Sequence, residues 1–354
     1  MSKYLELGLF LPSTKGGLVI AKNMPTDRDA TWSLNKEVTL AAEAAGMEFA
    51  LSQVKWRGYG GESGHWDAAN ESFTLIAGLA AVTSKIKLIA SVATRTINPA
   101  VIAKMAATAY DIAGGRFAVN IVAGWNKFEY AQMGLWNDDD YYLNRYEYAD
   151  EYLTILKRLW TEESVTFQGK YFTLDDCRSW PKPKQMPQIV CAGQSEGALA
   201  FVAREANYSF IGRMNDTPEQ LGEVAKKISG MAAEHGRTIT NYTLLNVIAG
   251  KTQEEAEARR ARYLADRDEV AIQEWLRASG MDRNRADYLK LPPEATAFMS
   301  VPYIVGSHET VARHLDKLAE HGLGGVALTF PDFANDLPDF IENVMPKMTS
   351  RNNA

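Results

Sequence analysis

Residues 7–17 read Leu7-Gly8-Leu9-Phe10-Leu11-Pro12-Ser13-Thr14-Lys15-Gly16-Gly17, an apolar strand followed by a polar turn. In an open, doubly wound α/β sheet, the first strand usually leads into a G-x-G-x-x-G turn that binds a dinucleotide. The turn here lacks that glycine spacing, and the sequence carries no P-loop motif. A closed α/β barrel is therefore the better interpretation of the strands that follow.

Short apolar runs alternate with helical patterns along the rest of the chain, which is typical of βα units and a parallel sheet. The candidate strands are residues 5–11, 48–52, 87–93, 117–122, 187–192, 208–211, 242–249 and 325–329. Several are almost continuously apolar, such as Ile189-Val190-Cys191-Ala192, as expected for strands that are covered on both faces. Eight strands are the number that closes a (β/α)₈ (TIM) barrel, which is the fold we predict.

The spacing of apolar residues predicts helices over residues 35–45, 71–82, 99–112, 146–159, 218–235 and 309–320. Thr217 followed by Pro218 is a typical helix start. We expect one domain over residues 1–354, with insertions at about 123–186 and 250–324, because each of these gaps exceeds one helix. The insertions either cover an active site or elaborate the surface.

Composition restricts the class of partner. The 354 residues are 46% hydrophobic and 23% charged, with a net charge of −6, which argues against nucleic acid or an anionic membrane as the main partner. We find no signal-peptide pattern and no apolar run of about 20 residues, so we expect a cytoplasmic protein without membrane contact. Cys177 and Cys191 are interpreted as small hydrophobic residues rather than a redox pair.

Function in a barrel collects at the carboxyl ends of the strands, where this chain has a candidate phosphate site. The turn Gly193-Gln194-Ser195 is expected to open a helix, so it offers backbone N–H groups, a hydroxyl and a helix dipole to a phosphate. The alternative is an ordinary N-cap serine. Arg145-Tyr146, expected to open another helix, would add charge-assisted bonds to the same phosphate, or would be a surface arginine beside a core aromatic residue.

Other chemistries find little support in the sequence. The histidines are His65, His235, His308, His314 and His321, and none forms the paired pattern of a zinc protease, so we expect no metal site. The last three are expected to be solvated. No G-x-S-x-G motif supports a hydrolase triad, and Asp138-Asp139-Asp140 is interpreted as a solvated turn. The residues alone therefore indicate an acidic barrel with a phosphate-bearing ligand, and they do not name a reaction.

Several motifs resemble those of the pyrimidine oxygenases of bacterial uracil degradation, a family within the bacterial-luciferase-like flavin monooxygenases. The likeness runs from about Leu5 to Gly212, returns near Val305-Gly306-Ser307 and Leu328-Thr329-Phe330, and is weak between about Thr240 and Pro302. The motifs are Met47–Ser52, Lys55–Gly61, Glu71–Thr74, Gly78–Ser84, Gly114–Phe117 with Val119-Asn120, Gly124-Trp125, Glu129-Tyr130, Gln132–Gly134, Arg145-Tyr146 and Cys191–Ser195.

The resemblance implies a barrel with insertions that binds FMN. The flavin would arrive in its reduced form from a separate NAD(P)H:flavin reductase, with O₂ as co-substrate, and the barrel would form a homo-oligomer. By position, the implied flavin contacts are Val54, Lys55, Asn120, Glu129, Arg145, Tyr146 and Ser195, with Gly193 in the phosphate turn.

The implied chemistry is oxygen attack on a small nitrogen heterocycle or cyclic amide such as a pyrimidine, as part of nitrogen metabolism. Within the family, O₂ is expected to react at the flavin N5 rather than at C4a, and the resulting peroxide attacks as a nucleophile. Asn120 and Ser91, where the family carries Thr, stand where donors would steady the developing charge. Trp125 either walls the pocket and stacks on a planar substrate, or plugs the core.

Two departures leave the substrate open. Arg95 and Asn98 stand where the family carries leucine. If Arg95 points into the pocket, it joins Lys55 and Trp125 as a substrate contact and indicates a more acidic or more polar substrate than uracil. If it points outward, it is a packing difference. The alternatives are the same chemistry on a sulfone, a halogenated aromatic or a larger heterocycle, or a flavin- or deazaflavin-dependent reductase, which needs no O₂.

Overall fold

Eight parallel strands close into a barrel in the order β1-β2-β3-β4-β7-β8-β9-β11, with β11 pairing back onto β1. The computed structural model describes residues 4–136, 138–193, 195–281 and 290–351. The predicted (β/α)₈ barrel is confirmed, and each predicted strand corresponds to one barrel strand. Their bounds are β1(Glu6–Phe10), β2(Phe49–Ser52), β3(Lys87–Ala93), β4(Phe117–Val122), β7(Gln188–Ala192), β8(Tyr208–Ile211), β9(Thr240–Gly250) and β11(Gly325–Thr329).

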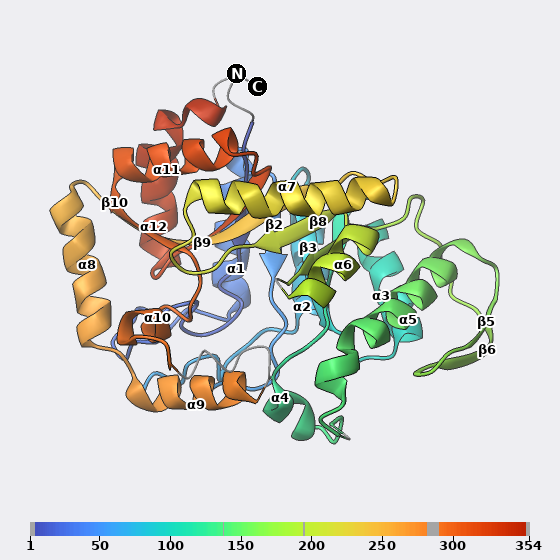
Figure 1. The fold of residues 1–354 in the computed structure, drawn as a ribbon. Helices are drawn as coiled ribbons and strands as arrows, with labels where there is room; N and C mark the ends of the chain where they lie inside the picture. The colour runs from blue at the N-terminus through green and yellow to red at the C-terminus, as the bar shows by residue number, and fades with distance from the viewer. Residues whose placement is uncertain (1–3, 137, 194, 282–289, 352–354) are drawn as a thin grey trace.

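Helices surround the barrel (Figure 1). They are α1(Trp32–Ala44), α2(Ser72–Val82), α3(Pro99–Ile112), α5(Tyr141–Thr161), α6(Glu196–Glu205), α7(Pro218–Glu234), α11(His308–Glu320) and α12(Phe333–Asp339). Thr217 caps α7 as predicted, with a reciprocal bond to Gln220 and Pro218 at the first helical position. None of the helices in the described ranges is both long and apolar enough to span a membrane.

The expected start of one helix is wrong. The helix predicted from residue 146 begins at Tyr141, so Arg145 and Tyr146 do not open it but lie further along α5. Tyr141 and Tyr142 are both buried, and they extend the apolar face of the helix toward its amino end. Arg145 is itself buried, so it is not the surface arginine of the alternative interpretation.

The two predicted insertions contain helices and strands whose bounds the sequence patterns do not predict. The first, 123–186, holds α4(Lys127–Ala131) and the hairpin β5(Val165–Gln168)–β6(Thr173–Cys177). The second, 250–324, holds α8(Gln253–Ala265), α9(Glu269–Gly280), α10(Pro293–Ala297) and β10(Tyr303–Ser307), which pairs with the end of β9. In Figure 1, α4, α9 and α10 lie at the end of the barrel toward which the arrow of β2 points.

Side chains of α9, of α4 and of the turn after α10 meet in one apolar cluster above the carboxyl ends of the strands, here called the cap cluster. It joins side chains of α9 to those of the β2–α2 loop and of the turn after α10. Its main members are Tyr59, Trp66, Ile272, Trp275 and Met299, with Trp125 and Phe128 packed against them. The insertions therefore cover the end of the barrel where function is expected.

The amino end of the barrel interior is filled by aromatic side chains. Phe49 stacks on Tyr242 with ring centroids 4.8 Å apart, and Tyr208 and Phe210 pack against the same tyrosine. Gly8 makes this possible, because a Cβ at that position would collide with the ring of Phe49. Open space inside the barrel is therefore confined toward the carboxyl ends of the strands.

Candidate active site

A cavity of about 180 Å³ lies at the carboxyl ends of β1 to β4. This is well above the roughly 10–15 Å³ that one water molecule needs. Six residues that the sequence singled out line it: Val54, Lys55, Ser91, Asn120, Trp125 and Glu129. Phe10, Gln53, Trp66 and Tyr130 also line it, and the sequence offered no reason to single them out as ligand contacts.

A directed chain of hydrogen bonds orients Asn120 at the cavity wall. Asn120 Nδ2 donates to Ser91 Oγ at 2.9 Å, and Ser91 Oγ donates to the carbonyl oxygen of Ser52 at 2.6 Å. Because a carbonyl only accepts, Ser91 must be the acceptor toward Asn120, which fixes the amide orientation. Asn120 Oδ1 is left buried without a partner among the described residues. The site thus holds an oriented acceptor ready for a ligand N–H group.

Lys55 and Glu129 form a buried ion pair in the same cavity. Their side chains are 3% and 8% exposed, and Lys55 Nζ lies 3.4 Å from Glu129 Oε2. The other carboxylate oxygen of Glu129 accepts from the backbone N–H of Trp56. Glu129 lies in the first turn of the short helix α4 in the first insertion, so the pair ties that insertion to the loop after β2. A fixed cation therefore stands beside the cavity with its charge balanced by one carboxylate.

Aromatic rings enclose the Lys55 ammonium. Its Nζ lies 4.9 Å from the ring centre of Tyr59, 5.0 Å from that of Trp66 and 5.5 Å from that of Trp125. Such contacts stabilise a desolvated cation through the negative ring face. Trp125 therefore faces the cavity and also packs on the cap cluster, so both interpretations of this residue describe part of its environment.

His65 packs against Trp66, one of the rings around the Lys55 ammonium. His65 was not singled out from the sequence as a site residue. Its fully buried ring stacks on Trp66, and its Nε2 lies 3.2 Å from Met299 Sδ. Burial, and then the charge of Lys55, lower the pKa of His65 to about 3. The ring is thus neutral at physiological pH, and it adds no second cation to the cavity.

The predicted phosphate turn lies against α5. Ser195 caps α6 by accepting from Ala198 N at 3.3 Å. Gly193 has no side chain, and a Cβ at this position would lie 3.2 Å from the Tyr146 hydroxyl oxygen. The Tyr146 hydroxyl group is therefore close to the backbone of Gly193, just before α6 begins. Arg145 stacks near Tyr146 and donates to the carbonyl oxygen of Gly124 at 3.3 Å. Gln194 of the predicted turn lies outside the described residues.

Arg95 and Asn98 have structural partners away from the cavity. Arg95 Nη2 donates to the carbonyl oxygen of Leu135 at 2.6 Å, and its guanidinium lies 4.7 Å from the ring centre of Tyr141. It is absent from the described residues that line the cavity. Asn98 is the exposed N-cap of α3 and accepts from Ala100 N at 2.8 Å. The geometry thus places Arg95 in the packing of the α4–α5 connection.

Replacing Arg95 by leucine is expected to lower the free energy of unfolding by about 1–3 kcal/mol, because a charge-assisted hydrogen bond is lost. Thermal denaturation measures this change. The KM for the substrate is expected to stay within about twofold of that of the wild type. A KM raised by tenfold or more, with unchanged thermal stability, would instead make Arg95 a substrate contact.

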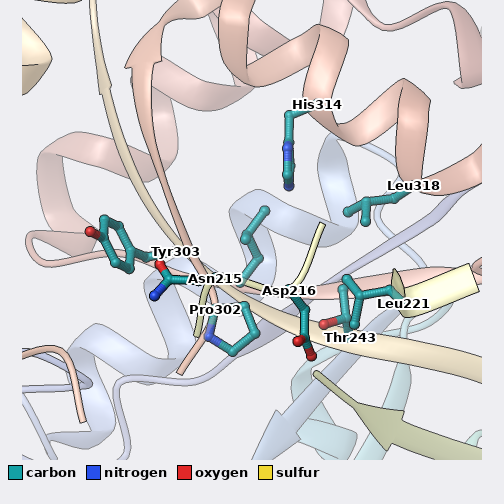
Figure 2. A pocket seen from close by; sticks show the side chains of 9 residues that line it. Asn215, Asp216, Leu221, Thr243, Pro302, Tyr303, His314 and Leu318 are labelled. Carbon is teal, nitrogen blue, oxygen red and sulfur yellow. The ribbon is translucent and has the colours of Figure 1, made fainter. Parts of the chain in front are cut away.

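A second, smaller cavity of about 50 Å³ lies outside the barrel between α7, β9 and α11. Figure 2 shows His314 and Leu318 projecting from α11 toward Leu221 and Thr243. It contains none of the residues that the sequence singled out for chemistry. Its lining is Asn215, Asp216, Leu221, Thr243, Leu245, Pro302, Tyr303, His314 and Leu318.

The expectation that the last three histidines are solvated is wrong for His308. It is buried at the start of α11, and its Nε2 lies 2.9 Å from Oδ2 of Asp339, the last residue of α12. Burial is also the largest cause of the lowered pKa of His314. In the described part of the chain, no group of three or more His, Cys, Asp or Glu side chains is arranged to hold a metal ion.

Comparison with known proteins agrees with the barrel fold and also identifies the protein family. The model of the luciferase-like monooxygenase family matches residues 5–324. Pyrimidine monooxygenase RutA of Caulobacter vibrioides is 43% identical over 354 residues, which covers 98% of this chain and 99% of that protein. RutA of Pseudomonas savastanoi pv. phaseolicola is 43% identical over 352 residues, which covers 98% of this chain and 97% of that protein.

Among solved structures, riboflavin lyase RcaE, in a crystal structure with modified FMN and riboflavin, superposes with a TM-score of 0.86. The superposition covers 99% of this chain and 94% of that one at 21% sequence identity. At this level of identity the superposition bears on the fold alone. The cavity, the ion pair and the helix start described above therefore lie in a fold that this chain shares with riboflavin lyase.

Proposed function

This chain belongs to the luciferase-like monooxygenase family, and on that premise we propose that it uses reduced FMN and O₂ to oxygenate and open the ring of a pyrimidine or a related small cyclic amide. The observation that carries the proposal is the cavity at the carboxyl ends of the strands. There an oriented acceptor, Asn120, and an enclosed cation, Lys55, face a space walled by aromatic rings. Relatives named pyrimidine monooxygenases support the substrate class.

The residues present fit FMN in two places. Gly193 and Ser195 precede α6, Tyr146 of α5 lies beside Gly193, and Arg145 lies next to Tyr146, an arrangement that suits a phosphate group. The unpaired Asn120 Oδ1 suits an N–H group at the edge of a flat ring. Val54, Lys55 and Glu129 line the same cavity and would complete the ring site. Reduced FMN, when bound there, supplies the electrons that activate O₂.

The side chains of this chain would bind and steady the reacting groups. One oxygen atom enters the substrate and the other leaves as water. The Lys55 ammonium, held by Glu129, offers a preorganised positive charge to an oxygen atom that becomes negative. Trp66 and Trp125 exclude water from the cavity, which strengthens this interaction. Within the proposal, a separate NAD(P)H:flavin reductase supplies the reduced flavin, and the chain assembles as a homo-oligomer.

The proposal is tested by reconstituting the protein with FMN, NADH, a generic flavin reductase and isotopically labelled O₂. Uracil, thymine and related cyclic amides serve as candidate substrates. Mass spectrometry is expected to find one labelled oxygen atom in a ring-opened product. If flavin binds but no member of the panel is converted, the proposed substrate class is wrong. Conversion that continues without O₂ would contradict a monooxygenase.

Replacing Arg145 by methionine is expected to weaken FMN binding by roughly 10–100-fold, because one charge-assisted bond to phosphate is lost. Riboflavin lacks the phosphate, so its affinity is expected to stay close to that of the wild type. Quenching of flavin fluorescence measures both affinities in the same variant. An equal loss for the two flavins would place Arg145 in a general structural role rather than at the phosphate.

A further inference from the structure

Strand β9 carries an asparagine, Asn246, on the inner face of the barrel near its carboxyl end. Alternate residues of the strand face inward, beginning with Tyr242, which stacks on Phe49 inside the barrel. The residues between them, Leu245 and Val247, belong to the outer core under the helices. Asn246 therefore projects toward the interior, beyond the aromatic side chains that fill the amino end.

Neither end of the Asn246 side-chain amide has a hydrogen-bond partner in the described ranges. The residue is 1% exposed, and neither Oδ1 nor Nδ2 makes a hydrogen bond among the described residues. Asn241 on the same strand is also buried, yet its Oδ1 accepts from Ser209 Oγ at 2.7 Å and its Nδ2 donates to Ser229 Oγ at 3.0 Å. A buried amide with both ends unpaired is costly and rare, so it calls for an occupant that pairs with it.

The register of the sheet links Asn246 to the cavity. Thr329 of β11 pairs with Asn246, and Leu328 of β11 pairs with Leu9 of β1. The next residue of β1, Phe10, therefore lies beside Thr329 on the neighbouring strand. Phe10 is half-buried and lines the cavity. A continuous row of inward positions thus runs from the cavity to Asn246 around the barrel.

A strained turn lies over this end of β9. The carbonyl oxygen of Pro302 accepts from the backbone N–H of Asn246 at 3.0 Å. Just before it, Met299 and Ser300 adopt left-handed backbone conformations, with φ of 52° and 55°. Two successive non-glycine residues of this kind are costly, and such strain clusters at ligand clamps. Met299 also belongs to the cap cluster, which ties the turn to the cavity.

We infer that Asn246 binds the amide edge of a planar ring, in which an N–H and a C=O stand side by side. An asparagine amide presents one donor and one acceptor in a plane, so it pairs with such an edge through two hydrogen bonds. The inference rests on the proposed function, which supplies two sources of the edge. One is the cyclic-amide substrate, and the other is the dioxopyrimidine part of the flavin ring.

The test compares Asn246→Leu with Asn241→Leu. Leucine matches asparagine in shape, so at position 246 it removes an unsatisfied amide and is expected to keep or raise the thermal midpoint. Binding is expected to weaken by roughly 10–100-fold, the equivalent of one or two hydrogen bonds. Asn241→Leu breaks satisfied bonds, so it is expected to lower the midpoint and leave binding as in the wild type.

Binding is measured without turnover. FMN is titrated by fluorescence, and uracil is titrated calorimetrically into the FMN-loaded protein. Loss of uracil affinity alone assigns the substrate edge to Asn246, and loss of FMN affinity assigns the flavin edge. If neither affinity changes, the inference is overturned. If the wild type binds FMN but not uracil, the proposed substrate is wrong and the FMN titration alone decides. Asn246→Ala replaces the leucine variant if that variant does not fold.

Discussion

Replacing Glu129 by alanine is expected to lower the free energy of unfolding by about 3–5 kcal/mol, because it leaves the Lys55 ammonium as a buried charge without its carboxylate. The backbone N–H of Trp56 loses its acceptor in the same variant. Denaturant unfolding measures the change. A loss below about 1 kcal/mol would mean that water or a rearranged partner replaces the carboxylate, and that the pair is not held as the structure has it.

The paired replacement separates stability from function. Lys55→Met with Glu129→Leu removes both charges, and such exchanges of buried pairs are often neutral or stabilising. We expect the double variant to regain most of the stability and still to lack oxygenase activity, because the enclosed cation is gone. Glu37→Ala removes an exposed ion pair with Arg28 and serves as the control, with no change in the unfolding midpoint.

Replacing Asn120 by alanine is expected to lower kcat by roughly 10²–10³-fold, the usual cost of removing one preorganised hydrogen-bonding group from a reacting site. The fold is expected to survive, since within the described ranges the Asn120 side chain has one hydrogen-bond partner, Ser91. Product formation with FMN, a flavin reductase and a pyrimidine measures kcat. FMN affinity, measured in parallel by fluorescence, is expected to fall by less than about tenfold, because other residues share that binding.

Variants of Ser91 test whether the contribution of Asn120 to kcat depends on the orientation of its side-chain amide. Ser91→Ala removes the acceptor that orients Asn120, so kcat is expected to fall even though Asn120 remains. Ser91→Thr keeps the hydroxyl and is expected to keep most of the activity. If Ser91→Ala retains full activity, the hydrogen-bond chain does not set the orientation of Asn120. If Asn120→Ala itself retains full activity, the catalytic role of this amide is wrong.

Much of the barrel was predictable because its strands are buried on both faces. Ile189 to Ala192 and the equivalent runs are continuously apolar, a pattern that is typical of parallel strands covered on both faces. The start of α5 was missed because Asp138–Asp140 precedes it and looks like a turn, whereas Tyr141 and Tyr142 continue the buried face. The hairpin β5–β6 and strand β10 are four or five residues long, too short for a periodic pattern.

The candidate site was predictable in part. The resemblance pointed to Lys55, Ser91, Asn120, Trp125 and Glu129, and the structure brings these residues to one cavity. It also pointed to Arg145 and Tyr146, which lie together beside the start of α6. His65, Trp66 and Asn246 carried no local signal, because what distinguishes them is burial beside partners that are distant in the sequence.

The sequence by itself determined the number and order of the barrel strands, the capping of α7 and the family likeness, since each depends on residues that are close together in the chain. Only the tertiary structure decided where Arg95 points and that Glu129 neutralises Lys55. It also decided that, in the part of the chain that the structure describes, the Asn246 amide has no hydrogen-bond partner while the Asn241 amide is bonded at both ends. The physical reason is that charge pairing and hydrogen-bond satisfaction are properties of atoms in contact. Strands that are far apart in the sequence bring those atoms together when the barrel closes.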